Sequence, residues 1–350
     1  MSRWVKRNYP DVKSDLCTCF IERGFSLARD RGYAAMVTMQ SWMFLGSFEK
    51  MRSSLIDAKA IVSMAHLGPR AFDAIGGEVV NVTADVVYNV RAACEGAYVR
   101  LVDINGSEAK RLKLLEAIGN PDCGWFYRRE AETFKRIPGT PIAYWASDAM
   151  LGLFANNPQI SDVAFPKQGS TLGNNELFLR RWYEVSNGSS RWFPYMKGGV
   201  FRRWYGNQTY VVDWADDGKN VRNLGRATIR NKEYLFRRGL TWSNISSSLA
   251  AFRLMPEGFF FESSGTALFA ASEMQLTYLL GYLNSSISKE INGMVNPTLH
   301  FQSGDIGKQP YIEQSHNPAI QILVKKCIAD SIADYDTFEA SWDFRRHPLV

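Results

Sequence analysis

Between residues 14 and 104, segments with helical spacing alternate with short apolar runs, and this alternation restricts the fold to the layered α/β class. In the segment Ser14 to Arg29, apolar residues recur every three or four positions, which predicts a helix. The unbroken apolar run Tyr33 to Met39 predicts a strand that is buried on both faces of a sheet. A second helix is expected from Ser47 to Asp57, and a second buried strand from Ile61 to Leu67.

Two further apolar runs, Val82 to Val90 and Tyr98 to Ile104, predict an antiparallel hairpin that closes this sheet. A helix is expected from Ser107 to Ile118, with Ser107 as its N-cap and Gly119 just after its end. The segment opens on a helix and lacks the leading βαβ units that such a sheet normally has. The sequence therefore predicts the second half of an α/β domain.

The 350 residues suffice for about two domains. The segment from Ile137 to Pro166 holds four of the thirteen prolines, which is typical of a connection between domains. Beyond it, short aromatic runs are broken by Gly, Asn and Asp, and helices return at Glu273 to Ile291 and at Ala319 to Ile332. This pattern predicts a mixed α+β domain. The expected parts are an α/β domain, a connector, the mixed domain and a C-terminal helical segment, at residues 1–136, 137–165, 166–318 and 319–350.

Positive charge is concentrated in one region of the chain. The whole sequence has a formal charge of +6, whereas residues 166–250 alone carry +8 together with five Trp and five Tyr. The clusters RWFPYMKGG (191–199) and FRRWYGN (201–207) combine cations, flat rings and glycines. Such a mixture suits a polyanion that also presents flat bases, that is, a nucleic acid. The alternative is that the aromatic residues form a core and the cations a solvated face.

The sequence argues against several classes of protein. No apolar run approaches the roughly 20 residues that a membrane span needs, and no secretory leader is recognised, so a soluble, cytoplasmic chain is expected. Five cysteines without a C-x-x-C pair favour neither a disulfide framework nor a zinc site. Cys17 and Cys19 are expected to pack rather than to bind metal. Neither a metal nor a membrane partner is expected.

Several blocks in register give the chain a family resemblance. They are SDLCTCFIERGFSLARDRGYAAMVTMQSWMFLGSF (14–48), HLGPRAFDAIGGEVVNVTADVV (66–87), IPGTPIAYWASD (137–148), KQGSTLGNNELFLRRWYEV (167–185), GLTWSNISS (239–247), NPTLHFQSGDIGKQPY (296–311) and ASWDFRRHPL (340–349). With these blocks the chain resembles the PglX-type adenine-specific DNA methyltransferases of BREX phage-defence systems. The resemblance covers essentially the whole chain in the family's order.

The resemblance implies a fold and a division of labour. The chain would comprise the C-terminal half of a Rossmann-like class I methyltransferase domain, followed by a mixed α+β target-recognition domain. The family binds S-adenosylmethionine, flips the target adenine out of double-stranded DNA and reads the DNA sequence with the recognition domain. The family's cofactor turn and its catalytic N-P-P-Y loop are both absent, because the sequence contains neither a G-x-G nor adjacent prolines. We therefore expect no catalytic or cofactor-binding residues here, and no tight binding of S-adenosylmethionine by this chain alone.

The resemblance also suggests individual site residues. Phe72 corresponds to the aromatic that stacks on the flipped adenine, with a core role as its alternative. Trp42 could wall the base pocket, although core packing is the preferred interpretation. The loop Gly76-Gly77-Glu78 is expected near DNA or cofactor. The expected DNA contacts are Lys167, Asn174, Asn175, Arg180, Lys197, Arg202, Arg203, Asn207, Trp242, Ser243 and Lys308.

Three functional hypotheses remain open from the sequence. In the first, the chain is part of an N6-adenine DNA methyltransferase of a BREX or type II restriction-modification-like system, and a separate chain supplies the missing half. In the second, it is a catalytically inactive module that binds DNA or other defence-system proteins. A remnant without an independent role is the third and blandest reading. A neighbouring reading frame ending in N-P-P-Y would favour the first hypothesis.

Overall fold

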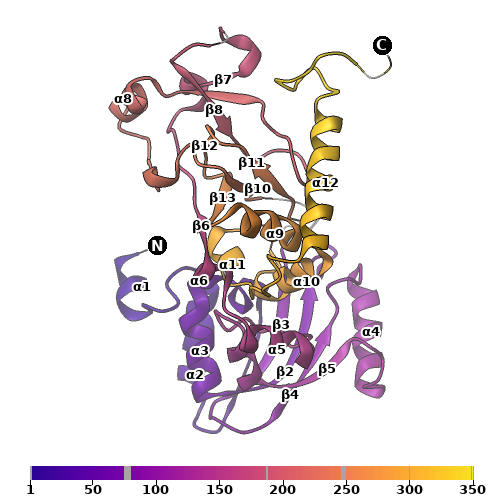
Figure 1. Ribbon diagram of the computed structural model, residues 1–350. Coiled ribbons are helices and arrows are strands. Elements are labelled where there is room, and N and C mark those ends of the chain that lie inside the picture. The colour runs from indigo at the N-terminus through magenta and orange to yellow at the C-terminus, as the bar shows by residue number, and fades with distance from the viewer. Residues whose placement is uncertain are drawn as a thin grey trace. The chain divides into compact units, whose positions relative to one another are not determined.

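The computed structural model describes residues 2–74, 80–186, 188–245, 250–298, 300–347 and 349. The chain divides into two compact units, Met1–Asn156 and Asn157–Val350 (Figure 1). Their boundary lies inside the segment 137–165 that was predicted to connect two domains. This segment is not a free connector, because Ile137, Ile142 and Tyr144 are fully buried within unit 1.

Unit 1 is built on a five-stranded mixed sheet with the strand order β1-β3-β2-β4-β5. Its strands are β1 (Tyr33–Met39), β2 (Ala60–Gly68), β3 (Val82–Tyr88), β4 (Glu95–Arg100) and β5 (Phe126–Glu130). Strand β3 pairs antiparallel with both β1 and β2, while β4 pairs parallel with β2. The predicted β3–β4 hairpin is therefore wrong. Both edges of β3 are already occupied, so β4 takes the free edge of β2.

The helices of unit 1 are α1 (Arg3–Asn8), α2 (Leu16–Leu27), α3 (Glu49–Ala58), α4 (Ser107–Gly119) and α5 (Asp148–Asn156). Three 3₁₀ turns, at Gln40–Met43, Gly46–Phe48 and Ala131–Arg136, complete the unit. Helix α2 begins at Leu16, inside the predicted range, because Asp15 accepts a hydrogen bond from the Cys17 amide at 2.8 Å and caps the helix. Helix α4 begins differently, since Ser107 lies inside the helix and Gly106 precedes it. The carboxylate of Asp73 takes over the cap by accepting bonds from the Ser107 amide and hydroxyl.

One face of the sheet is covered by α2, α3 and the segment around Tyr144. The core there includes Ile21, Leu55, Met64 and Tyr98. Cys19 is buried and Cys17 packs against the same core, as expected for packing residues.

The opposite face of the sheet is open over β1, β3 and β2. Ala35 and Val37 are exposed, and Ala65, Ala84 and Val86 are half-buried. With Leu114 and Ile118 of α4 they border a hollow of about 570 Å³. We call this surface the open sheet face. Strand β1 is therefore an exposed edge strand, and the prediction that it is buried on both faces is wrong. An apolar run in the sequence shows that a strand has an apolar face. It does not show whether other described residues cover that face.

Unit 2 contains two four-stranded sheets, ordered β11-β10-β13-β6 and β12-β8-β9-β7. The strands are β6 (Ala164–Lys167), β7 (Leu179–Arg181), β8 (Trp192–Met196), β9 (Tyr210–Asp213), β10 (Gly239–Ser243), β11 (Phe252–Met255), β12 (Phe260–Phe261) and β13 (Gly265–Ala270). The helices are α6 (Ile160–Val163), α7 (Asn175–Phe178), α8 (Ala215–Asn223), α9 (Glu273–Leu283), α10 (Ser286–Val295), α11 (Ser303–Gly307) and α12 (Pro318–Tyr335). In Figure 1 the yellow α12 runs beside α9.

The helix predicted from Glu273 to Ile291 is two helices, α9 and α10. The break falls at Asn284 and Ser285, where Ser285 accepts a hydrogen bond from the Ser288 amide and so starts the second helix. Asn284 is held at the junction by hydrogen bonds to the backbone of Phe252. The aromatic residues of unit 2 largely fill its core, as Tyr195, Trp214, Phe260 and Phe269 show. The mixed α/β fold agrees with the fold class predicted from the sequence.

Candidate functional site

Three strands of unit 1 end at the same edge of the sheet. Strands β1, β2 and β4 run in the same direction, since β1 and β2 are both antiparallel to β3 and β4 is parallel to β2. Their carboxyl ends bring Gln40, His66 and Arg100 to one edge. In open α/β sheets this is where ligand sites are usually built.

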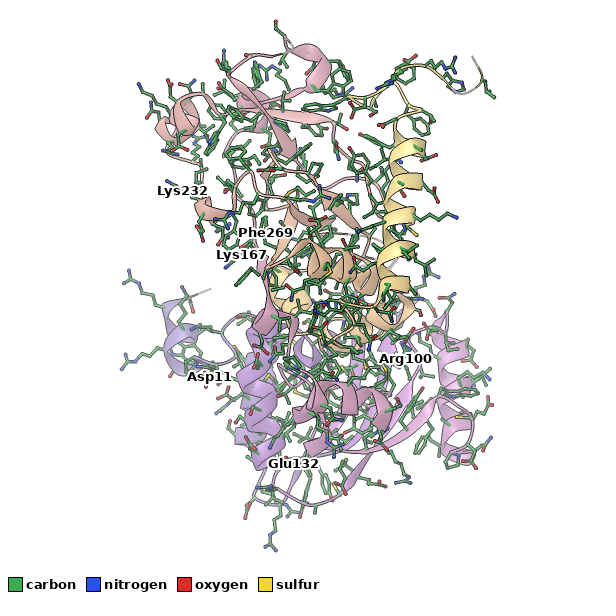
Figure 2. The ribbon with its side chains drawn as sticks, viewed as in Figure 1. Asp11, Arg100, Glu132, Lys167, Lys232 and Phe269 are labelled. Atoms are coloured by element: carbon green, nitrogen blue, oxygen red, sulfur yellow. The ribbon has the colours of Figure 1, made fainter. Side chains whose placement is uncertain are left out.

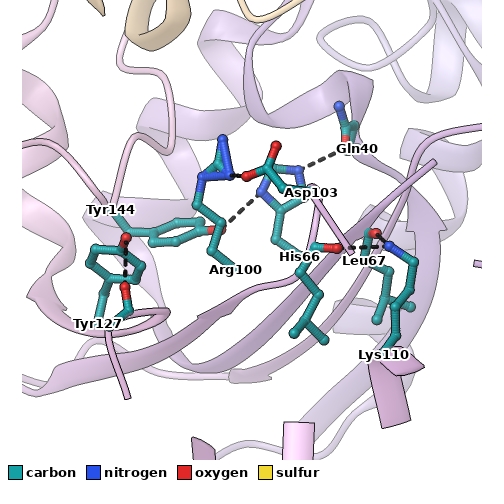
Figure 3. A network of polar contacts seen from close by, with 10 residues as sticks. Gln40, His66, Leu67, Arg100, Asp103, Lys110, Tyr127 and Tyr144 are labelled. Carbon is teal, nitrogen blue, oxygen red and sulfur yellow. Dashed lines mark hydrogen bonds and ion pairs between the residues drawn. The ribbon is translucent and has the colours of Figure 1, made fainter. Parts of the chain in front are cut away.

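A chain of hydrogen bonds joins the ends of β1 and β2 to Tyr144 (Figure 3). The His66 ring lies between two partners, with Nδ1 2.9 Å from the Tyr144 hydroxyl and Nε2 2.7 Å from Oε1 of Gln40. An amide oxygen can only accept, so in this arrangement Nε2 carries the proton and Nδ1 accepts from Tyr144. These hydrogen bonds fix the Gln40 amide at the edge of the sheet, and its NH₂ group is directed away from His66.

The environment keeps His66 neutral. The side chain is buried, and burial together with the nearby charges of Arg100 and Lys110 lowers its pKa to about 3. Lys110 itself is held by the carbonyls of Leu67 and Leu101, at 2.5 and 2.7 Å. His66 is therefore suited to orient a neighbour by hydrogen bonding and not to carry a charge or exchange protons near neutral pH.

Aromatic rings and one cation surround these hydrogen-bonded side chains. Phe44 and Trp145 contact the His66 ring at centroid distances of 6.0 and 6.2 Å. The Arg100 guanidinium lies 5.3 Å from the centroid of Trp145 and pairs with the exposed Asp103 at 2.8 Å. We call Gln40, His66, Arg100, Tyr144 and Trp145 the sheet-edge cluster. Sequence reasoning missed it, because its members come from four separated segments.

The residues predicted for the base pocket lie in different surroundings. Phe72 follows β2 and is 46% exposed, so its ring is accessible. Trp42 is 1% exposed and donates to the Thr38 hydroxyl at 3.1 Å, which supports the core interpretation. The loop Gly76-Gly77-Glu78 lies outside the described residues. Among the described residues no group of three or more His, Cys, Asp or Glu side chains could hold a metal ion.

In unit 2 the block 167–175 runs against the segment 226–231. The backbones of Thr171 and Thr228 exchange two hydrogen bonds, at 3.0 and 2.9 Å. The Ser170 hydroxyl accepts from the Arg230 amide at 3.0 Å, and the Asn231 side chain donates to the Gln168 carbonyl at 2.8 Å. This pairing places the block that contains the predicted contacts Lys167, Asn174 and Asn175 beside the segment 226–231, for which no DNA contact was predicted.

The segment 226–232 carries three exposed cations, Arg226, Arg230 and Lys232, and we call it the basic segment. No ion pair involving them occurs among the described residues. Lys167 and Lys232 lie on the same side of unit 2 in Figure 2, and the Lys167 ammonium sits 4.8 Å from the ring centroid of Tyr234. The signal available in the sequence was the high density of Arg and Lys without matching acids from 219 to 238.

The predicted contacts in the loop 197–207 are partly used within the protein. Arg202 pairs with Asp334 at 3.5 Å and lies over the Tyr335 ring, so it ties the loop to α12. Asn207 donates to the Val200 carbonyl at 2.9 Å and closes the loop. Lys197 and Arg203 are half-buried.

The remaining predicted contacts differ in accessibility. Trp242 is fully buried and donates to the Phe301 carbonyl at 2.7 Å, so its ring is a core side chain and not a surface contact. Ser243 bonds the Gly199 backbone, while Asn174 caps α7 and Asn175 is exposed. Arg180 donates to backbone carbonyls, and Lys308 ends α11. Among the described residues, none of the helices is long and apolar enough to cross a membrane.

Comparisons with known proteins show which class of proteins has a similar fold. Residues 1–72 match the family described as Eco57I restriction-modification methylase. The fold is similar to the Type IIL restriction-modification enzyme MmeI in complex with DNA, with a TM-score of 0.61 at 10% identity over 98% of this chain and 49% of that chain. It is also similar to the Type ISP enzyme LlaGI in complex with a DNA substrate mimic, with a TM-score of 0.56 at 11% identity over 91% of this chain and 37% of that chain. The chain thus shares the fold of restriction-modification methyltransferases.

Two curated relatives narrow the class. The adenine-specific methyltransferase PglX of Lacticaseibacillus casei (strain Zhang) is 38% identical over all of this chain and 31% of its own length. The adenine-specific methyltransferase BrxX of Escherichia coli O9:H4 (strain HS) is 39% identical over all of this chain and 29% of its own length. The chain is therefore a relative of the PglX-type adenine-specific methyltransferases, as the sequence blocks predicted. It spans about a third of the length of these two proteins.

Proposed function

We propose that this chain provides target recognition and part of the adenine pocket of a site-specific N6-adenine DNA methyltransferase of a phage-defence system. The observation that carries the proposal is the pairing of the block 167–175 with the basic segment. It brings the block that contains Lys167 beside the exposed residues Arg226, Arg230 and Lys232, and in this proposal the four cations neutralise phosphates of double-stranded DNA. The two relatives at 38% and 39% identity support the choice of reaction.

In this proposal the sheet edge of unit 1 forms one wall of the pocket for the flipped adenine. The exposed Phe72 stacks on the base, and the sheet-edge cluster lies at the carboxyl ends of the strands, where such folds hold their ligands. The Gln40 amide, fixed by His66, would present hydrogen-bond donors there. The stacking role of Phe72 is a prediction. Replacing Phe72 by Ala should weaken recognition of the target adenine without weakening duplex binding.

The open sheet face indicates what completes the site. A large apolar surface on a soluble domain commonly marks an interaction site, and β1 has a free edge among the described residues. We propose that the polypeptide carrying the cofactor turn and the N-P-P-Y loop covers this face. In these enzymes the Asn side chain and the prolyl carbonyl of that loop accept hydrogen bonds from the adenine N6 amino group, and the sequence of this chain contains no adjacent prolines.

S-adenosylmethionine is the methyl donor that this proposal implies. The sequence contains no G-x-G, the pattern of the glycine turn that holds the cofactor's methionine portion in this family. We propose that the chain alone binds the cofactor no better than millimolar. Isothermal titration calorimetry checks this, and micromolar binding by the isolated chain would contradict it.

The alternative is a catalytically inactive module that binds DNA or other defence-system proteins. The open sheet face favours a protein partner under this alternative as well. Mixing the chain with the remaining part of a PglX-type relative distinguishes the part of an enzyme from the inactive module. Adenine methylation that depends on this chain supports the enzyme, whereas association without methylation supports the module. A location in the cytoplasm stays a prediction.

A mobility shift of the full chain on methylated and unmethylated genomic DNA fragments, at two salt concentrations, tests the proposed function. We expect retention of a subset of unmethylated fragments that persists at the higher salt concentration, because base contacts are less salt-sensitive than phosphate contacts. The contrary result is equal retention of all fragments at low salt and of none at the higher salt concentration. It would mean that the chain binds phosphates without recognising a target, and it would contradict the proposal.

A further inference from the structure

Unit 2 contains a cavity of about 460 Å³ that is walled by aromatic rings. Trp182 and Tyr183 follow β7, Trp192 begins β8, and Trp342 comes from the segment after α12. A cavity of this volume is in the range of sites that hold one small ligand. It lies apart from the surface proposed above to hold the phosphates of the duplex, because neither the block 167–175 nor the basic segment lines it.

Two of the indole rings are fixed by hydrogen bonds to the backbone. Trp182 donates to the Ala340 carbonyl at 3.0 Å, and Trp342 donates to the Gln208 carbonyl at 2.5 Å. Their ring centroids are 6.1 Å apart, and Trp342 is still 38% exposed. Because both N–H groups are satisfied, the flat apolar faces remain available to a ligand, and little side-chain freedom would be lost when it binds.

Three guanidinium groups lie against aromatic rings that line this cavity. Arg180 and Arg191 lie over the Trp192 ring, at 5.8 and 5.1 Å from its centroid. Arg181 lies over Tyr183 and donates to its hydroxyl at 2.5 Å. Asp213 pairs with Arg191 but is 2% exposed.

None of the described residues that line the cavity carries a carboxylate. An aromatic cage alone would also suit a quaternary ammonium ion, but three guanidinium groups against one exposed carboxylate, that of Glu184, disfavour a positive ligand. Flat rings beside exposed guanidinium groups are complementary to a planar ring that carries a phosphate.

We propose that this aromatic cavity binds one unstacked nucleotide, with its base against Trp182 and Trp342 and its phosphate beside Arg181. The inference rests on the proposed DNA-binding function and deepens it. Bases inside a duplex are stacked on one another, so only a base outside the stack can offer its faces to these rings. The ligand is therefore a nucleotide at a single-stranded or distorted position, or a free nucleotide of the same chemistry.

The test measures binding of the full chain to three probes: deoxyadenosine monophosphate, a labelled single-stranded oligonucleotide and a blunt duplex of equal length. We expect Trp342→Ala to weaken binding of the single strand by roughly five- to a hundredfold, because one aromatic contact to a base is lost. Trp342→Phe should retain most of the affinity. Trp4→Ala, which removes a 63% exposed Trp from unit 1, is the matched control and should have no effect.

The outcomes separate the inference from the proposed function. Weaker single-strand binding in both Trp342→Ala and Arg181→Ala, with duplex binding intact, supports the cavity. Mononucleotide binding that Trp342→Ala abolishes supports the same cavity with a free nucleotide as its ligand. Unchanged single-strand binding in both folded variants overturns the inference, whereas a chain that binds no DNA at all overturns the proposed function. Circular dichroism confirms that each variant is folded.

Discussion

The Nδ1 atom of His66 lies 2.9 Å from the hydroxyl of Tyr144, which is 78 residues further along the chain. Both side chains are buried, and the contact joins the end of β2 to the segment that leads out of the sheet. The same His66 ring holds Gln40 through Nε2. One imidazole therefore connects three segments at the edge where we place the base pocket.

Replacing Tyr144 by Phe should destabilise unit 1 by roughly 1–3 kcal/mol, because it leaves the buried Nδ1 of His66 without a donor. Tyr127→Phe is the matched control, since its hydroxyl makes a long 3.4 Å bond to the Gly124 carbonyl and the residue is half-buried. Urea unfolding measures both. Equal free energies of unfolding for the two variants would show that the hydrogen bond of Tyr144 contributes nothing.

Asp85 gives unit 1 an unusual pH dependence. Its carboxyl group is buried in the sheet, on β3, and burial raises its pKa to about 7. The folded state therefore holds a proton that the unfolded state releases near pH 4, so stability falls as the pH rises from about 4 to 7. We expect Asp85→Asn to be more stable than the parent chain at pH 8, by at most about 4 kcal/mol, and equally stable near pH 4. The same gain at both pH values would contradict this assignment.

His66 has the opposite effect over a similar range. Its pKa is lowered to about 3, so the unfolded state binds a proton below about pH 6.5 while the folded state does not. Stability from this group is present above pH 6.5 and is lost as the pH falls toward 3. The Asp85→Asn variant removes the opposing contribution of Asp85, so its free energy of unfolding should decline from pH 7 to pH 4 as the contribution of neutral His66 is lost. A flat profile would show that His66 is protonated in the fold.

Arg52 should be the side chain whose loss is most costly in unit 1. It is fully buried, and its guanidinium donates to the carbonyls of Trp42, Leu45, Gly139 and Thr140. Arg52→Met leaves those carbonyls without donors and should cost roughly 3 kcal/mol or more. Lys50→Met on the same helix removes an exposed cation and should change stability by less than about 0.5 kcal/mol. Thermal and urea unfolding provide the comparison.

The open sheet face should make the isolated chain associate with itself. Val37 is 61% exposed on the edge strand β1, and a charge there would oppose edge-to-edge pairing. We expect Val37→Lys to lower the apparent mass in analytical ultracentrifugation toward that of a monomer, with little change in the unfolding transition. A parent chain that is already monomeric and binds no hydrophobic dye would show that this face needs no partner.

The sequence predicted the elements of unit 1 better than their pairing. The helix at Leu16–Leu27 and the strand at Tyr33–Met39 follow from local spacing and a local cap. The partner of β4 cannot be predicted from local spacing, because β4 pairs with β2 only when both edges of β3 are occupied. Local patterns carry no information on which edge of a sheet is free.

The candidate sites show the same division. The basic and aromatic residues of unit 2 were recognised by their density, but Trp242 was placed on the surface although its indole is a core side chain. Arg230 was overlooked, because its neighbours in the sequence are not aromatic. The sheet-edge cluster draws on residues between positions 40 and 145, and only the fold brings them together.

The basic segment carries the central claim that this chain recognises DNA. The most direct test is the salt dependence of duplex binding, measured by fluorescence anisotropy, for Arg226→Ala/Arg230→Ala/Lys232→Ala against Lys289→Ala/Lys325→Ala/Lys326→Ala. Both triple variants remove three exposed cations from unit 2, so they change the net charge equally. We predict that the first variant binds duplex DNA more weakly and that its slope of log affinity against log salt concentration falls by roughly 2–3 units, while the second keeps the slope of the parent chain. Equal slopes in the two variants would contradict the account.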